Sequence, residues 1–319
     1  MDNNEQQYKV CVIGVGSIAK RHIRNMAKLS EERGMRFTID AVRRGGNRDG
    51  IEDLPIRNVY RTVEEIGEYD AIFITNPTEV HLTTLDQVRG KARAYFIEKP
   101  VTSIKNLRAA EKDPYYAKEF CYVACPLRYC QVIRYLRKHI PEWNICSVRA
   151  ISSSYLPDWR PGVDYRQTYS ARRELGGGVS IDLIHEWDYL KHLFGLPEKV
   201  VYYGGKKSTL EIDSDDIAVY LAEYPDMLVE LHLDYFGRKA IREILIFTDE
   251  DTVRADLIKN QIEFLRTGEV ISFDEVRDDY QKRELVHFFK IVDGRKSDGT
   301  IKEAVQTMKL TQGLIPKRS

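Results

Sequence analysis

The stretch Tyr8–Ala19, with the sequence YKVCVIGVGSIA, decides the fold of this 319-residue chain. Its first part is a short apolar run rich in residues that favour β-strands. Helical periodicity begins at Ser17 and continues to about Leu29. A strand that passes through glycines into a helix is how a βαβ unit starts, so this stretch predicts the first strand and first helix of a parallel sheet.

Two glycines and an alanine lie in the turn and at the start of that helix. Gly14, Gly16 and Ala19 form the pattern G-x-G-x-x-G/A, with alanine in the third place. The first glycine permits a tight turn, the second lets the backbone approach a pyrophosphate, and the small third residue lets helix and strand pack closely. The pyrophosphate would lie against the amides at the positive end of the helix, near Ser17 and Ile18. The motif predicts a dinucleotide site, with a plain structural turn as the alternative.

The rest of the first part of the chain alternates strand and helix signals. Further strands are expected at Phe37–Val42, Ala71–Thr75, Ala94–Ile97 and Phe120–Ala124. Helices are expected from about Val80, and from Ser103, as N-cap, to about Lys112. This alternation predicts a Rossmann domain over residues 1–125, in an α/β protein with a doubly wound parallel sheet.

The pattern changes in the remaining residues, 126–319, where strand follows strand on short connections. The expected strands are Cys146–Tyr155, Val200–Tyr203, Ile217–Glu223, Met227–Tyr235, Ile241–Phe247, Val253–Leu257 and Gln261–Leu265. Helices are expected at Asp274–Val292 and Ile301–Leu314, and the second of these could pack back on the first domain. Such a series predicts an α+β substrate and oligomerisation domain with a mostly antiparallel sheet.

The end of the second strand bears on which dinucleotide binds. Asp40 lies about 20 residues beyond the glycines, where a carboxylate can bond the ribose hydroxyls of NAD. The strand continues past it, however, and ends at Arg43 and Arg44, which can neutralise a 2′-phosphate. We therefore expect NADP, with NAD as the alternative.

Two further segments carry chemistry. Glu98-Lys99-Pro100 ends a strand of the parallel sheet, outside whose carboxyl edge ligands bind, so Lys99 is expected near the cofactor. Asp182 and His185 lie in a helix that follows three glycines, and a histidine flanked by carboxylates can shuttle protons at neutral pH. The alternatives are a solvated lysine and a structural histidine.

The order and spacing of these elements resemble those of the glucose–fructose oxidoreductase/inositol dehydrogenase (Gfo/Idh/MocA) family over nearly the whole chain. The matching elements are Gly14–Ala19, Thr75-Asn76-Pro77 with His81, Glu98-Lys99-Pro100, and Gly176–Asp188. The resemblance implies a Rossmann domain followed by a domain with an open sheet that commonly mediates oligomerisation, as a homodimer or homotetramer. It also implies oxidation or reduction of sugars, cyclitols or related compounds, with the nicotinamide between the domains.

The same resemblance assigns roles to residues of this sequence. Lys99 would contact the reacting hydroxyl, His185 would be the main proton acceptor, and Asp182 would orient or assist it. Asn76, Pro77, His81 and Glu98 would belong to the cofactor site. Asp182 and His185 are three residues apart, where many members have four, so His185 is the safer assignment. Arg128 matches an arginine that follows the last Rossmann strand, where Cys125 replaces the usual asparagine.

A loop rich in Tyr, Trp and Arg, residues 155–173, separates the second domain's first strand from the His185 helix. Guanidinium groups bind carboxylate or phosphate, and aromatic rings stack on sugar faces, so the loop favours an acidic or nucleotide-linked sugar. The candidate substrate residues are Trp159, Arg160, Tyr165 and Arg166 in this loop, together with Arg128 before it. An arm that packs on a partner subunit is the alternative.

Composition excludes several other classes. Lys plus Arg equals Asp plus Glu, at 49 each, so the basic surplus that nucleic-acid binding needs is lacking. No signal peptide, membrane span or metal-binding cysteine pair is visible, and five scattered cysteines suit the cytoplasm. Tyr202 and Lys206 have the spacing of a short-chain dehydrogenase, but within a β-rich stretch. A catalytically silent cofactor-binding regulator remains the alternative, although the presence of Lys99 and His185 disfavours it.

Overall fold

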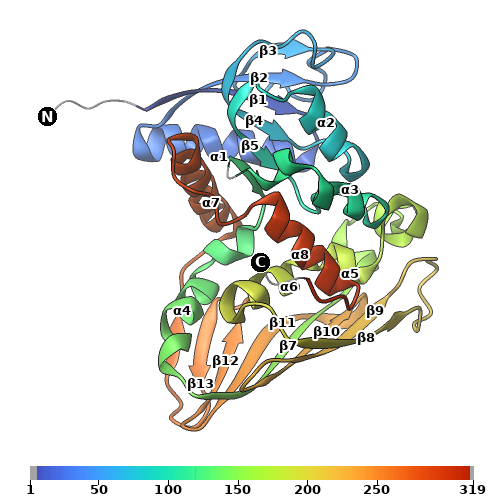
Figure 1. Cartoon of the computed structure of the whole chain (residues 1–319), viewed down its shortest axis with the longest axis vertical. Coiled ribbons are helices and arrows are strands. Elements are labelled where there is room, and N and C mark those ends of the chain that lie inside the picture. Colours follow the sequence, from blue (N-terminus) through green and yellow to red (C-terminus); the bar gives the residue numbers. More distant parts are fainter. Residues whose placement is uncertain (1–5, 119, 317–319) are drawn as a thin grey trace, which may run out of the picture. The chain divides into compact units, whose positions relative to one another are not determined.

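The computed structural model describes residues 6–118 and 120–316. They divide into two compact units, each built from two separate pieces of the chain. The first unit contains Met1–Pro126 and Val276–Val305, and the second contains Leu127–Glu275 and Gln306–Ser319. Figure 1 shows the elements in the colours of the sequence.

The first unit contains a six-stranded, fully parallel sheet with the order β3-β2-β1-β4-β5-β6. Its strands are β1 (Gln7–Ile13), β2 (Arg36–Val42), β3 (Ile56–Tyr60), β4 (Tyr69–Ile74), β5 (Ala92–Ile97) and β6 (Cys121–Val123). Its α-helices are α1 (Ser17–Arg33), α2 (His81–Gln87), α3 (Leu107–Lys112) and α7 (Arg277–Val292), and its 3-10 helices are η1 (Thr78–Val80), η2 (Ile104–Asn106) and η3 (Pro114–Ala117). This strand order is that of a dinucleotide-binding Rossmann sheet and confirms the predicted fold class.

Helix α7 belongs with this parallel sheet, although the sequence placed residues 126–319 in the second domain. Phe288 contacts the rings of Phe73 and Phe96, with centroids 5.3 and 5.2 Å apart, and Phe289 packs on Tyr8 at 4.5 Å. All five side chains are at most 3% exposed. The predicted boundary was therefore wrong for residues 276–305, because the aromatic face of α7 is buried in the core of the first unit.

Two local predictions in this unit were also wrong. No strand was predicted at Ile56–Tyr60, where β3 forms the edge of the sheet with only one buried residue, Ile56. Such an edge strand lacks the continuous apolar run that reveals a buried parallel strand. Ser103 does not cap a helix: its side chain makes no capping hydrogen bond, a 3-10 turn follows it, and α3 begins only at Leu107.

The second unit contains an eight-stranded sheet with the order β14-β13-β12-β11-β7-β10-β9-β8. Its strands are β7 (Ile145–Tyr155), β8 (Lys199–Gly205), β9 (Ile217–Glu223), β10 (Leu228–Asp234), β11 (Phe236–Thr248), β12 (Thr252–Asp256), β13 (Gln261–Phe264) and β14 (Val270–Ser272). The pair β7–β10 is parallel and the other pairs are antiparallel, as predicted.

Helices cover one face of this sheet (Figure 1). The helices of the unit are α4 (Gln131–His139), α5 (Val179–Asp182), α6 (Ile184–Phe194), and the 3-10 helices η5 (Ile140–Glu142), η6 (Leu156–Trp159), η7 (Tyr165–Gln167), η8 (Tyr169–Ala171) and η9 (Arg173–Leu175); η4 (Pro126–Tyr129) and α8 (Ile301–Thr311) are shared between the two units. Strand β9 shows the resulting alternation, with Ala218, Tyr220 and Ala222 buried and Leu221 45% exposed. One face of the sheet therefore holds the core, and the other carries exposed apolar side chains.

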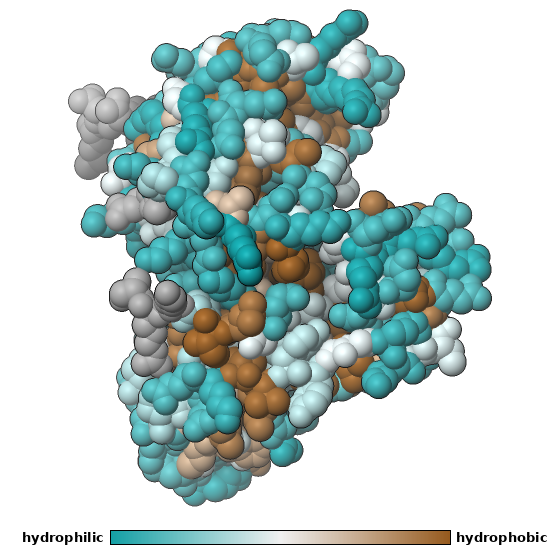
Figure 2. Space-filling model, turned by 45° about the vertical axis from the view of Figure 1, so that its right-hand side comes forward, coloured by the Kyte–Doolittle hydropathy of each residue, from teal (hydrophilic) through white to brown (hydrophobic). Residues whose placement is uncertain are grey.

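The surface in view in Figure 2 is mostly hydrophilic, with some hydrophobic patches. Within residues 6–118 and 120–316, no helix combines the length and hydropathy that crossing a bilayer requires.

Candidate active site

The glycine turn lies between the end of β1 and the start of α1, as the motif predicts. Gly14 has a φ of +87°, and a Cβ placed on it would lie 2.7 Å from both the Cα and the N of Asn76. Its N–H donates to the carbonyl oxygen of Val42 at 2.9 Å. The hydroxyl of Thr75 donates to the Gly14 carbonyl at 2.7 Å. Gly14 is therefore required both by its backbone angle and by the close approach of the segment after β4.

The N-terminus of α1 suits an anion. Gly16 is the N-cap, no side chain caps the helix, and its first turn contains no acidic residue. A Cβ on Gly16 would have no neighbour within 4 Å, and both Gly16 and Ser17 are exposed. Unused amide donors at the positive end of a 17-residue helix, beside open space, fit the pyrophosphate of a dinucleotide.

Asp40 lies within β2, and Arg43 and Arg44 follow that strand. The carboxylate and the two arginines have different partners. Asp40 is fully buried, and it accepts hydrogen bonds from the guanidinium of Arg57 at 2.7 and 3.0 Å and from the hydroxyl of Tyr69 at 2.9 Å. Burial raises the pKa of Asp40, but these hydrogen bonds outweigh that effect and hold it below the usual 3.8. Arg43 donates to a carbonyl of the following loop, and Arg44 is exposed. The Asp40 carboxylate is thus occupied by hydrogen bonds from other strands of the sheet, while Arg44 faces solvent.

The ends of β4 and β5 are joined by a buried histidine. The Nε2 of His81 lies 2.8 Å from the carbonyl oxygen of Asn76, and its Nδ1 lies 3.0 Å from that of Pro100. Burial lowers the pKa of His81, and the contacts with the two carbonyl oxygens partly oppose this effect; in the neutral ring one of the two nitrogens donates to its carbonyl. Pro77 is exposed at the start of the short helix η1, which lies between Asn76 and His81. His81 therefore holds together the two strand ends predicted to line the cofactor site.

Glu98 and Lys99 follow β5 directly. The Oε1 of Glu98 lies 2.7 Å from the Nε2 of His22, and its Oε2 accepts the backbone N–H of Lys99 at 3.2 Å. Burial raises the pKa of Glu98, but the contact with His22 and the charges nearby, including Lys99, bring it below the usual 4.5. Both carboxylate oxygens of Glu98 are thus engaged by the protein, next to the half-buried Lys99.

No chemical role was predicted for His22 from the sequence. It is 1% exposed on α1, four residues beyond Ile18 and on the same helix as the glycine turn. The signal that could have revealed it is a histidine on the core side of the helix that also carries the dinucleotide motif. Through Glu98, His22 connects α1 to the segment that follows β5 and contains Lys99.

The predicted helix that carries Asp182 and His185 is two helices in the second unit. Helix α5 ends at Asp182, the backbone departs from helical values at Leu183 (φ −95°, ψ 31°), and α6 begins at Ile184. The residues from Val179 to Ile184 are all at most 9% exposed. Burial of six consecutive residues shows that this segment is surrounded by protein on all sides and has no exposed stripe.

Asp182 and the neighbouring acid Asp188 have different partners. The Oδ2 of the 6% exposed Asp182 accepts a hydrogen bond from the hydroxyl of Tyr235 at 2.5 Å. The Asp188 carboxylate accepts two hydrogen bonds from the guanidinium of Arg128, at 2.7 and 2.8 Å. Arg128 therefore joins the segment before α4 to α6. Tyr235 was not predicted; its only sequence signal was its position at the end of an expected strand.

The loop of residues 155–173, here called the aromatic arm, carries four of the five candidate substrate residues, and the fifth, Arg128, is the partner of Asp188. Trp159 and Arg160 line a small pocket together with Tyr165, and the guanidinium of Arg160 lies over the ring of Tyr169 at 5.7 Å. The exposed Arg166, in contrast, is paired with Asp164 at 2.9 Å and with a second carboxylate at 2.7 Å. Trp159 and Arg160 are thus the substrate-binding candidates at the pocket. Arg166 instead forms ion pairs within the arm and with a neighbouring loop.

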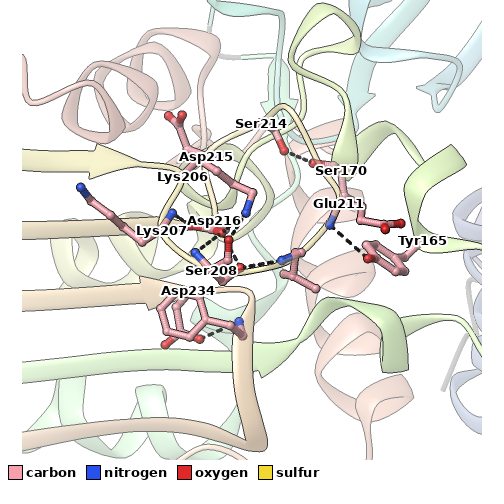
Figure 3. A network of polar contacts seen from close by, with 12 residues as sticks. Tyr165, Ser170, Lys206, Lys207, Ser208, Glu211, Ser214, Asp215, Asp216 and Asp234 are labelled. Atoms are coloured by element: carbon pink, nitrogen blue, oxygen red, sulfur yellow. Dashed lines mark hydrogen bonds and ion pairs between the residues drawn. The ribbon is translucent and has the colours of Figure 1, made fainter.

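That neighbouring loop, between β8 and β9, closes around the buried carboxylate of Asp216 (Figure 3). The N–H of Glu211 donates to the hydroxyl of Tyr165 at 3.2 Å, and the hydroxyl of Ser214 donates to the carbonyl of Ser170 at 2.6 Å. The hydroxyl of Tyr165 is therefore used to fix the arm. In the described part of the chain, no group of three His, Cys, Asp or Glu side chains is arranged to hold a metal ion.

A parallel sheet with a glycine turn that fits a dinucleotide, in a chain whose second unit is an open sheet covered by helices on one face, is the architecture of a Rossmann-type protein with a second α+β unit. Comparison with known proteins agrees with this. Residues 133–254 match the model of the GFO/IDH/MocA C-terminal domain. The second unit thus resembles the C-terminal domain of the Gfo/Idh/MocA family.

Individual relatives are distant. YrbE, an uncharacterized oxidoreductase of Bacillus subtilis (strain 168), is 24% identical over 219 residues, which cover 65% of this chain and 61% of YrbE. The match thus spans less than two thirds of that relative's length.

Two solved structures share the fold. Levoglucosan dehydrogenase in complex with NADH and levoglucosan has a TM-score of 0.82 at 15% identity, covering 97% of this chain and 96% of the other. UDP-N-acetylglucosamine 3-dehydrogenase GnnA from Acidithiobacillus ferrooxidans has a TM-score of 0.76 at 19% identity, with the same coverage.

Proposed function

We propose that the chain is an NAD(P)-dependent dehydrogenase or reductase that transfers a hydride to or from a hydroxyl- or keto-bearing carbon of a sugar-like substrate. The observation that carries this proposal is the turn at Gly14 and Gly16, which leads into the uncapped, exposed N-terminus of α1. The nicotinamide dinucleotide, when bound, accepts or supplies the hydride. The match to the GFO/IDH/MocA C-terminal domain, and the similarity to relatives named as an oxidoreductase and an inositol 2-dehydrogenase, support the same reaction class.

Three residues of this chain would handle the proton and the reacting oxygen. Lys99 would donate a hydrogen bond to the substrate hydroxyl and stabilise negative charge on its oxygen as the proton leaves. His185 would accept that proton during oxidation and return it during reduction, because an imidazole can both accept and release a proton near neutral pH. Asp182 would assist His185. The motif spacing and the position of Lys99 directly after β5 support these roles.

The cofactor is proposed to be NADP, with NAD as the alternative. Arg44 is exposed after β2, and Asp40 is held by Arg57 inside the sheet, away from a ribose partner. A charge-assisted hydrogen bond contributes about 1.5–3 kcal/mol, so Arg44→Ala should raise the KM for NADP roughly 10–100-fold and leave that for NAD nearly unchanged. Kinetics with both cofactors test this. Equal effects on the two cofactors would contradict a 2′-phosphate contact.

The substrate is proposed to be an acidic or nucleotide-linked sugar bound along the aromatic arm. Trp159 and Arg160 at the arm's pocket offer a stacking surface and an anion partner. The names of the two structural neighbours, a levoglucosan and a UDP-N-acetylglucosamine dehydrogenase, support a sugar of either simple or nucleotide-linked form.

A cofactor-coupled screen tests the activity. Sugars, sugar acids and nucleotide sugars are offered with NAD and NADP side by side, and absorbance at 340 nm is followed. Lys99→Met should abolish turnover while dinucleotide binding is retained, and Lys105→Met, an exposed lysine in the same unit, should change neither. Dinucleotide binding without turnover of any substrate would instead support the regulator.

The chain is also proposed to form a homodimer or homotetramer through the uncovered face of the eight-stranded sheet. Tyr203 is 74% exposed there, and Leu221 and Leu228 are 45% and 46% exposed on the neighbouring strands. Exposed apolar patches of this kind mark interaction surfaces. Tyr203→Glu should shift the protein to a smaller species in size-exclusion chromatography with light scattering, whereas Lys105→Glu should not. A wild-type monomer would contradict the proposal.

The cytoplasm is the proposed location. All five cysteines are free thiols, and four of them are buried. Free thiols are usual in reducing compartments.

A further inference from the structure

Tyr235 is a buried tyrosine that none of the preceding roles uses. It directly follows β10, is fully buried, and donates its hydroxyl to the Oδ2 of Asp182 at 2.5 Å. Asp182 is itself only 6% exposed. A carboxylate that has lost water on burial depends on such donors to remain in one orientation.

The backbone and ring of Tyr235 are fixed on three sides. Its N–H donates to the carbonyl of Asp216 at 3.0 Å, and its carbonyl accepts the N–H of Leu156 at 2.9 Å. Its ring meets that of Trp159 edge to face, with centroids 5.3 Å apart and planes at 88°. Asp216 is the centre of the loop network in Figure 3. The hydroxyl is therefore held in place by the sheet, the β8–β9 loop and the aromatic arm together.

A second tyrosine faces the same carboxylate. Burial raises the pKa of the Tyr169 hydroxyl, and the charge of Asp182 and a hydrogen bond to it raise it further. Burial likewise raises the pKa of Tyr235 well above 10, followed by the effect of Asp182. Both phenols therefore keep their protons throughout the neutral range and act toward Asp182 as hydrogen-bond donors.

We propose that Tyr235 is a positioning residue, whose hydroxyl holds the Asp182 carboxylate in the orientation from which it serves His185. The proposal rests on the function proposed above. Tyr235 does not exchange its proton with the substrate; its contribution is to restrict Asp182 to one conformation. Because Trp159 contacts the same ring, the aromatic arm that borders the substrate pocket also supports the acid–base pair.

The test is Tyr235→Phe, which keeps the ring and removes the hydroxyl. Tyr220→Phe is the matched control: Tyr220 is 1% exposed on β9 of the same sheet and donates its hydroxyl to the carbonyl of Thr311 at 2.8 Å. Both variants lose one buried tyrosine hydrogen bond, so both should lose a similar amount of thermal stability. Only Tyr235→Phe should lower kcat, by roughly 10–100-fold, with KM changed less than about threefold and the dinucleotide Kd unchanged.

The dependence on Asp182 is tested by a double-mutant cycle. In an Asp182→Asn background, adding Tyr235→Phe should change kcat by less than about twofold. A full additive loss in that background, or a single Tyr235→Phe variant with wild-type kcat, overturns the proposal.

A crystallographic measurement separates this proposal from the activity itself. In crystals of Tyr235→Phe the Asp182 carboxylate should occupy more than one conformer, and in wild-type and Tyr220→Phe crystals only one. A single, unchanged Asp182 conformer in Tyr235→Phe overturns the positioning role whether or not a substrate is known. If instead Asp182 occupies two conformers in Tyr235→Phe crystals but no substrate is turned over in the screen, the result counts against the proposed function and not against the positioning role.

Discussion

Replacing Gly14 with alanine should destabilise the first unit by an amount that follows from the geometry of the turn. The residue has a φ of +87°, and adopting the left-handed region costs an alanine about 1–2 kcal/mol. The new Cβ would lie 2.7 Å from backbone atoms of Asn76, and such overpacking costs a further 1–3 kcal/mol or so. The sum, about 2–5 kcal/mol, corresponds to a fall in Tm of roughly 5–15 °C.

The assay is thermal unfolding followed by far-UV circular dichroism. Tryptophan fluorescence is unsuitable, because Trp143, Trp159 and Trp187 all belong to the second unit. Amide hydrogen exchange would localise the loss, which should be greatest at the Gly14 N–H bonded to the Val42 carbonyl.

Gly16→Ala supplies the contrast. Gly16 has a φ of −85° and open space where the Cβ would stand, so the Tm should remain within about 2 °C of wild type. The same methyl group would occupy the approach of the pyrophosphate, so dinucleotide affinity should fall. A Gly14→Ala protein that melts with the wild type would refute the argument from φ and contact distance. The same argument would also be refuted if Gly14→Ala and Gly16→Ala lowered the Tm by the same amount.

Three further predictions concern stability. Arg128→Ala leaves the 15% exposed Asp188 carboxylate without its two-pronged partner and should cost about 3–5 kcal/mol, measured by urea unfolding; a loss below 1 kcal/mol would contradict a buried pair. The pKa of Asp40 is held below 3.8 in the folded state, so its stabilisation is complete above that pH and is lost as the pH falls through the folded value. Asp40→Asn should therefore unfold with a weaker pH dependence below about pH 4 than wild type, and parallel curves would contradict this. Gly177→Ala would bring a Cβ within 2.0–2.8 Å of three carbonyl oxygens of residues 169–172 and should displace the aromatic arm, seen as increased proteolysis there; unchanged cleavage would show that the arm accommodates the methyl group.

The sequence was sufficient for the sheet architecture because the signals there are local and strong. Continuous apolar runs such as β1 and β4 lie inside the parallel sheet, and the series from β9 to β13 alternates as an antiparallel sheet with one covered face does. The glycine turn was also recognisable from its local motif, although the backbone that Gly14 approaches belongs to the segment after β4.

The side-chain arrangement of the candidate site could not be predicted in the same way, because it depends on contacts between distant segments. His22 meets Glu98 across 76 residues, and Tyr235 meets Asp182 across 53. Nothing in the spacing of Asp182 and His185 revealed the break at Leu183, because leucine is a good helix former and carries no helix-stop signal. Arg128 and Arg166 were recognisable as cations, but their carboxylate partners become visible only in three dimensions.

The place of α7 in the first unit has a consequence for how the chain folds during synthesis. The ribosome completes β1 to β6 before it makes any residue of the second unit, yet the aromatic face that covers Phe73 and Phe96 arrives with Phe288. At about 5–20 residues per second, the roughly 150 intervening residues delay that closure by about 8–30 seconds. During this interval the Rossmann sheet is translated but unfinished, with part of its core open to solvent and to chaperones. Translation speed through the second unit, and not only the stability of the first, should therefore influence how much of the protein reaches its native state.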